Sequence, residues 1–149
     1  ETPTLARLAK EHSNIVGVKE ASGNIAQMMD VISELPKNFD VLSGDDNMTL
    51  PLMALGGKGV ISVASNIVPN EMRELTQHAL NGNFEKAQQI HFRLLPLFKG
   101  IFMETNPIPI KAALAMKGMV NESYRLPMCD MKPENRKKLW QILKDLKIV

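Results

Sequence analysis

The chain has 149 residues, of which 44% are hydrophobic, and this suits one globular unit with a substantial core. Its formal net charge of +2 gives no electrostatic reason to expect a nucleic-acid or membrane partner, and no apolar run is long enough to span a membrane. The single cysteine, Cys129, excludes an internal disulfide framework and predicts a cytoplasmic protein.

The first 81 residues alternate between amphipathic helices and continuous apolar strands. In chain order we expect a helix over 2–11, a strand over 15–19, a helix over 25–35, a strand over 39–43, a short helix ending at 56–57, a strand over 60–64 and a helix from 69. Repeating units of this kind indicate parallel βα construction, and strands that are apolar throughout are typical of a sheet buried on both faces.

Several residues mark the boundaries and inner faces of these helices. Thr2 followed by Pro3 predicts an N-cap with proline in the first turn, and Asn24 can cap the second helix. The expected inner faces are Ile25, Met28, Met29, Ile32 and Leu35 in the second helix, and Met72, Leu75 and Ala79 in the helix from Pro69. Residues 56–59 lie between a helix and a strand, so we interpret their glycines as a tight turn and not as a phosphate-binding loop.

From Asn83 onward the pattern is purely helical. Asn83 caps a helix that runs through Lys99, Asn106-Pro107 opens a helix that ends near Gly118, and Pro133 opens the last helix. We therefore divide the chain into βα units over 1–81 and a C-terminal helical part over 82–149. Three parallel strands would leave two unpaired edges, and the chain opens directly on a helix start, so we expect it to be part of a longer fold.

A lysine follows the first apolar strand in the run Ile15-Val16-Gly17-Val18-Lys19-Glu20. The carboxyl end of an inner strand is where α/β folds hold their chemistry. Burial there favours the neutral ε-amine, which can attack a ketone or aldehyde to form a Schiff base. The alternative is a lysine that reaches solvent or pairs with a carboxylate.

Five motifs, in order along the chain, carry a resemblance to a known family. They are Gly17-Val18-Lys19-Glu20-Ala21-Ser22-Gly23-Asn24, Leu42-Ser43-Gly44-Asp45-Asp46, Gly56-Gly57-Lys58-Gly59-Val60-Ile61-Ser62-Val63, Asn106-Pro107-Ile108-Pro109-Ile110-Lys111 and Arg125-Leu126-Pro127-Met128. Over essentially its whole length, the chain resembles the C-terminal half of the dihydrodipicolinate synthase (4-hydroxy-tetrahydrodipicolinate synthase) family. These enzymes are pyruvate-dependent aldolases, a group that includes N-acetylneuraminate lyase.

The resemblance implies an α/β fold: the C-terminal part of a (β/α)₈ TIM barrel, strands six to eight, followed by a helical subdomain. It also implies a homo-oligomer, a dimer or a tetramer, that uses no cofactor. Lys19 would form a Schiff base with pyruvate, and loss of a methyl proton would give an enamine. The enamine would attack aspartate semialdehyde, and cyclisation would release 4-hydroxy-tetrahydrodipicolinate for lysine (diaminopimelate) biosynthesis. No metal is expected, since the histidines His12, His78 and His91 have no ligand spacing.

Four further positions are assigned to substrate binding by the same resemblance. Ile61 matches a residue whose backbone carbonyl lines the pyruvate site, and Gly44, Asp45 and Asp46 border the pocket for the second substrate. Asp45 or Asp46 would otherwise simply cap the next helix. We interpret Asn106-Pro107 as a structural cap.

The first five strands of the family supply groups that this chain does not contain. These are a proton-relay tyrosine, a Gly-Thr-Thr-Gly type hydroxyl pair, an arginine that binds a substrate carboxylate and the lysine-feedback site; Tyr124 does not map onto the relay. Three interpretations follow. The chain is part of a synthase and inactive alone, or another aldolase of the family acting on a sugar acid, or a non-catalytic half-barrel that serves in assembly through self-association.

Overall fold

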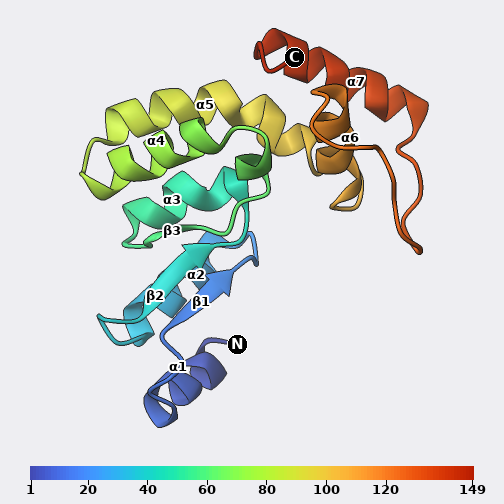
Figure 1. The fold of residues 1–149 in the computed structure, drawn as a ribbon. Helices are drawn as coiled ribbons and strands as arrows, with labels where there is room; N and C mark the ends of the chain where they lie inside the picture. Colours follow the sequence, from blue (N-terminus) through green and yellow to red (C-terminus); the bar gives the residue numbers. More distant parts are fainter.

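The computed structural model describes all residues from 1 to 149 and contains one sheet of three parallel strands in the order β1-β2-β3. The chain runs from α1 at one end of the molecule through stacked βα units to α7 at the other (Figure 1). The elements are α1 (Thr2–Glu11), β1 (Gly17–Glu20), α2 (Ile25–Glu34), β2 (Asp40–Ser43), η1 (Asp46–Met48), α3 (Thr49–Ala54), β3 (Gly59–Val60), η2 (Ala64–Asn66), α4 (Pro69–Leu80), α5 (Phe84–Gly100), α6 (Ile108–Met116) and α7 (Pro133–Asp145).

The register of the sheet separates a helix-covered face from an open one. Val18 lies beside Val41, and both contact the cluster formed by α2 and α3. The next pair, Lys19 and Leu42, lies on the opposite face, because successive side chains of a strand point to opposite sides.

No helix of this chain is both long enough and apolar enough to cross a membrane.

The predicted order of strands and helices is confirmed, while several boundaries differ. Asn24 caps α2 as expected, accepting hydrogen bonds from Ala26 N and Gln27 N. The predicted cap at Thr2 is wrong: Glu1 occupies the N-cap position, and Thr2 is the first helical residue, buried, with its hydroxyl accepting from Gln27 Nε2 at 3.3 Å. The first strand begins at Gly17 because Ile15 is held in a turn, its N–H donating to His12 O at 3.0 Å.

The apolar face predicted for α2 is only partly correct. Met28 and Val31 are the buried residues of the helix. Ile25 and Met29, predicted to face inward, are 41% and 47% exposed. The buried stripe is therefore narrower than the apolar spacing indicates. In α4, by contrast, the predicted inner residues Met72, Leu75 and Ala79 are all buried.

The third strand is shorter than the predicted range 60–64. Only Gly59 and Val60 pair with β2, and the chain turns into η2 at Ala64. The N–H groups of Val63 and Ala64 donate to the Asp46 carboxylate instead of to a neighbouring strand. A buried side chain thus ends the ladder, and no local sequence pattern reports it.

The C-terminal helices follow the predicted order. Asn83 caps α5 through Lys86 N, and Pro133 opens α7. The cap expected at Asn106 is wrong, because Pro107 holds the N-cap position of α6 and no side chain caps it. The largest core cluster combines α4 and η2 with α5, α6 and α7, so residues on both sides of position 81 pack together. The division at 81 and 82 stays a prediction.

Candidate active site

Two backbone hydrogen bonds connect the carboxyl ends of the three strands. Gly44 N donates to Glu20 O at 2.6 Å, which joins the end of β1 to the end of β2. Ile61 N donates to Ser43 O at 2.8 Å, which joins β2 to the residue that follows β3. As a result Lys19, Gly44 and Ile61, three of the residues predicted for the site, all lie at the carboxyl-terminal end of the sheet.

The side chain of Lys19 is exposed, as in the alternative of a lysine that reaches solvent, and not buried as the Schiff-base interpretation expected. Three strands form only one wall, so nothing covers the face on which Lys19 lies. Its Cε nevertheless lies close to the end of β2, 2.9 Å from the position that a Cβ on Gly44 would occupy. The lysine is therefore held at the strand ends but is not removed from water.

Gly44 is buried at the point where the chain leaves β2. A Cβ at this position would lie 2.5 Å from Ala21 Cβ and 3.2 Å from Glu20 O, in addition to the contact with Lys19. Any larger residue would displace the loop that follows β1. Glycine is thus required here by close packing beside the lysine.

The two acidic residues after Gly44 have different surroundings. Asp46 is 1% exposed, and its carboxylate accepts from Ser62 Oγ at 2.5 Å, Val63 N at 3.1 Å and Ala64 N at 3.0 Å. It therefore caps η2, across a gap of 16 to 18 residues, and not the helix that directly follows it. Asp45 is at the N-cap position of η1, but its side chain makes no capping hydrogen bond, so the predicted local cap is wrong.

The carboxyl group of Asp45 is electrostatically coupled to the strand ends. Burial raises the pKa of Asp45, and the neighbouring charges of Glu20 and Asp46 raise it further, while the charge of Lys19 lowers it. Asp45 is half-buried. Burial and the two neighbouring carboxylates thus disfavour the ionised form of Asp45, and the nearby lysine favours it.

Ile61 offers a backbone acceptor at the same edge. Its side chain is 48% exposed, and its carbonyl accepts no hydrogen bond within the chain. A carbonyl that is held in place but unpaired can accept a hydrogen bond from a ligand.

Sequence reasoning did not single out Glu20, which is buried beside the site. One carboxylate oxygen, Oε1, accepts from Ser22 N at 3.0 Å, and the other, Oε2, is buried without a partner. The available signal was strand alternation, because a residue next to the outward-lying Lys19 must point into the helix layer. A buried carboxylate with one free oxygen adds negative potential at the strand ends.

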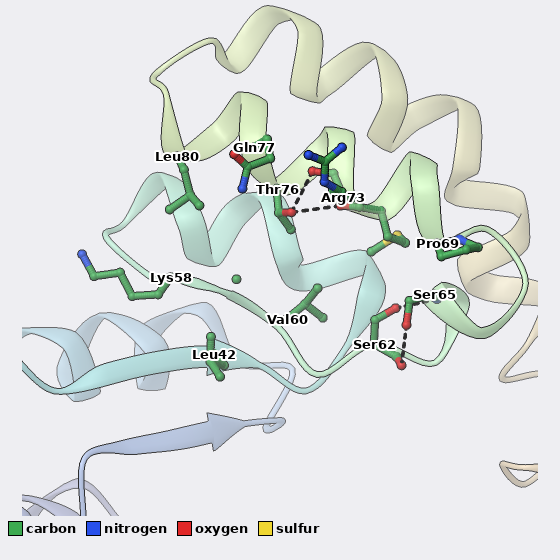
Figure 2. A pocket seen from close by; sticks show the side chains of 12 residues that line it. Leu42, Lys58, Val60, Ser62, Ser65, Pro69, Arg73, Thr76, Gln77 and Leu80 are labelled. Atoms are coloured by element: carbon green, nitrogen blue, oxygen red, sulfur yellow. Dashed lines mark hydrogen bonds between the residues drawn. The ribbon is translucent and has the colours of Figure 1, made fainter.

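A groove of about 420 Å³ lies beside the site, between β3 and α4 (Figure 2). Lys58, Val60 and Ser62 form its lower side, and Arg73, Thr76 and Leu80 of α4 form its upper side. Neither Lys19 nor Ile61 lines it. The groove therefore follows the free edge of β3 and is separate from the candidate active site.

No group of three or more His, Cys, Asp or Glu side chains is arranged to hold a metal ion.

Parallel βα units place this chain among the α/β proteins. The chain belongs to the dihydrodipicolinate synthetase family, whose model matches residues 1–146. It is 51% identical over 146 residues to 4-hydroxy-tetrahydrodipicolinate synthase of Hydrogenobaculum sp., covering 98% of this chain and 50% of that protein.

Two solved structures show the same fold. Dihydrodipicolinate synthase from Aquifex aeolicus matches with a TM-score of 0.97 at 48% identity, covering 99% of this chain and 50% of that one. The chloride-inhibited synthase from Acinetobacter baumannii, complexed with pyruvate, matches with a TM-score of 0.96 at 36% identity, covering 100% of this chain and 51% of that one. The chain thus spans about half the length of its relatives, and its three strands form part of a TIM barrel.

Proposed function

We propose that this chain supplies the Schiff-base half of a synthase that condenses pyruvate with aspartate semialdehyde to give 4-hydroxy-tetrahydrodipicolinate. The observation that carries the proposal is the position of Lys19, at a strand end and next to Gly44, on the side of the sheet where the unpaired Ile61 carbonyl follows β3. The high identity to synthases of this name and the pyruvate complex of one relative support the choice of substrates. We further propose that the reaction takes place in the cytoplasm, as a step of lysine biosynthesis.

In the proposed reaction, the neutral ε-amine of Lys19 attacks the keto carbon of pyruvate, and water leaves to form an imine. A methyl proton then leaves, and its bonding electrons form an enamine. The enamine carbon attacks the aldehyde carbon of aspartate semialdehyde, and the aldehyde oxygen takes up a proton. Attack by the amino group of the product on the imine closes the ring and releases Lys19. The Ile61 carbonyl would accept a hydrogen bond from the hydroxyl of the carbinolamine that precedes the imine, and Gly44, Asp45 and Asp46 would border the second substrate.

The proton-relay groups that resemblance assigns to the first five barrel strands must come from outside these 149 residues. Tyr124 does not replace them, since its hydroxyl is paired with Ile108 O at 3.3 Å and Glu122 Oε1 at 3.1 Å. Burial and the Glu122 charge raise the pKa of Tyr124, so the phenol keeps its proton. The exposure of Lys19 agrees with this need, because a completed barrel would remove the amine from water.

Borohydride trapping tests the proposal directly. The chain is incubated with pyruvate, with and without a second polypeptide that carries the first half of a relative's barrel, then reduced and peptide-mapped. We expect a reduced pyruvate adduct on Lys19 and none on exposed Lys58, which is the matched control, and Lys19→Arg should abolish it. The absence of an adduct in the completed sample, or an equal adduct on Lys58, would contradict the proposal.

Self-association is part of the same proposal. A groove of about 620 Å³ between α3 and α5 is bordered by Phe84 and Phe92, which are 40% and 59% exposed. Exposed aromatic surface of this kind favours a protein contact. An assembly module without catalysis would associate in the same way but would give no pyruvate adduct, and an aldolase for sugar acids would trap pyruvate but not condense it with aspartate semialdehyde.

A further inference from the structure

We infer that Asp46 is a positioning residue, which fixes the backbone segment Ile61–Ala64 and so places the Ile61 carbonyl for pyruvate. The inference rests on the proposed function for the role of that carbonyl. The placement of the segment itself rests on contacts within this chain.

Both oxygens of the Asp46 carboxylate accept hydrogen bonds from the residues that follow Ile61. Its two oxygens accept three hydrogen bonds, from the hydroxyl of Ser62 and from the N–H groups of Val63 and Ala64. At 1% exposure, water does not compete for these oxygens. Hydrogen bonds to a buried carboxylate are among the stronger ones in proteins.

The segment is also held on its other side. Ile61 N donates to Ser43 O at 2.8 Å, so the peptide is tied to β2 immediately before the carbonyl and to Asp46 immediately after it. Ser62 Oγ additionally accepts from Ser65 N at 2.8 Å, and Figure 2 shows the two serines close together beside the groove. Ser43 and Asp46 flank the Gly44-Asp45 turn, so this single turn of the chain determines where the Ile61 carbonyl lies.

The two adjacent carboxylates, Asp45 and Asp46, therefore differ in what they can bind. Both oxygens of Asp46 are occupied, one by the Ser62 hydroxyl and the other by two backbone N–H groups, whereas Asp45 is half-buried without a capping bond. Loss of Asp46 would release the segment after β3, and the carbonyl would no longer be fixed relative to Lys19. The expected effect is weaker binding of pyruvate, with imine chemistry at saturation largely retained.

The experiment compares Asp46→Ala with Asp46→Asn, which keeps an amide oxygen for the two N–H groups. Asp30→Asn removes an exposed carboxylate of α2 and is the matched control. Amide hydrogen exchange is first measured on the 149-residue chain. We expect Asp46→Ala to speed exchange at Val63 and Ala64 by about 10-fold or more, since each loses a hydrogen bond to a charged group. Asp46→Asn should give a smaller local change, and Asp30→Asn none.

The second measurement uses whichever sample labels Lys19 with pyruvate and borohydride. Asp46→Ala should raise the pyruvate concentration for half-maximal labelling by about 10-fold, with the maximal labelling rate changed by less than about 3-fold. Simple destabilisation would lower the labelled fraction at all concentrations and speed exchange throughout the sheet. Either result, or unchanged exchange at Val63 and Ala64, would overturn the inference.

A second variant and a separate readout cover two further outcomes. If Asp46→Ala does not fold, Ser62→Ala removes one of the three bonds, and unchanged local exchange in that variant would equally contradict the inference. If no sample of the unmodified protein traps pyruvate, the proposed function fails, whereas the exchange data still decide whether Asp46 holds the segment.

Discussion

At the scale of single residues, Gly44 shows how packing and chemistry meet at the strand ends. The space for a Cβ at this position is already occupied by Ala21 Cβ and Lys19 Cε. In the motif Gly-Asp-Asp the glycine leaves space for Ala21 and Lys19, which a side chain at this position would occupy. The Lys19 side chain lies against the backbone because residue 44 has no side chain.

We predict that Gly44→Ala destabilises the chain by about 1–3 kcal/mol, the usual range for overpacking a buried site. The added methyl group must push away the loop after β1, since Ala21 Cβ is only 2.5 Å from its position. Urea unfolding measures the change. Ala21→Gly removes the closest clash, so the double variant should recover part of the loss. Strictly additive effects in the double variant would show that the contact does not matter.

The residue scale also shows what the sequence could and could not predict. Lys19 stands out because a charged residue ends an apolar strand, and this signal is local. The role of Asp46 is invisible locally, because its partners lie 16 to 18 residues further along the chain. Glu20 was missed for a related reason: a glutamate in a motif is read as exposed, and only the pleat of β1 turns it inward.

At the scale of elements, the segment between α6 and α7 is fastened by a small charged network. Glu122 Oε2 accepts from Arg136 Nη2 of α7 at 2.5 Å, and Glu122 Oε1 accepts from the Tyr124 hydroxyl at 3.1 Å. The hydrogen bond from Arg136 lowers the pKa of Glu122, against the opposing effect of burial, and the bond from Tyr124 lowers it further. The network joins a segment without regular structure to the last helix.

This network predicts a pH dependence of stability with a defined sign. A carboxyl group whose pKa is lower in the folded state contributes stability above its unfolded value, about 4.5. That contribution is lost as the pH falls through the folded pKa. Glu122→Gln should therefore lose about 0.2–1 kcal/mol at pH 7, a small effect because both side chains are partly exposed, and should be indistinguishable from the unmodified chain below the folded pKa.

Thermal unfolding across this pH range measures the effect. Glu11→Gln breaks the exposed pair of Arg7 and Glu11 on α1 and is the matched control, expected to change stability by no more than about 0.5 kcal/mol. A Glu122→Gln penalty that persists at low pH would mean that packing, and not charge, fastens the segment.

The accuracy of element prediction differs between α4 and the third strand. Helix α4 was placed correctly because Pro69 marks its start and its apolar spacing marks its buried face. The third strand was predicted too long, since an apolar run such as Val60–Ala64 satisfies the pattern of a strand whether or not it finds a partner. The capture of two N–H groups by Asp46 depends on the folded chain.

At the scale of the whole molecule, the open sheet is the dominant feature. β1 and β3 each have a strand on one side only, and Val16, directly before β1, is 65% exposed. The groove beside β3 in Figure 2 follows one of these free edges. Unpaired strand edges recruit further strands. The relatives, about twice as long, have the chain length to supply them.

The last prediction follows from this open form. The 149-residue chain alone should not convert pyruvate and aspartate semialdehyde, because Lys19 is exposed and the proton-relay groups expected from the family are not in it. Adding a separately produced polypeptide with the first half of the Hydrogenobaculum synthase should restore product formation, measured by mass spectrometry, as strands pair with both edges. Lys19→Met in the same mixture should give no product. Conversion by the chain alone would show that one wall of a barrel is sufficient, and a stable complex without conversion would favour an assembly role.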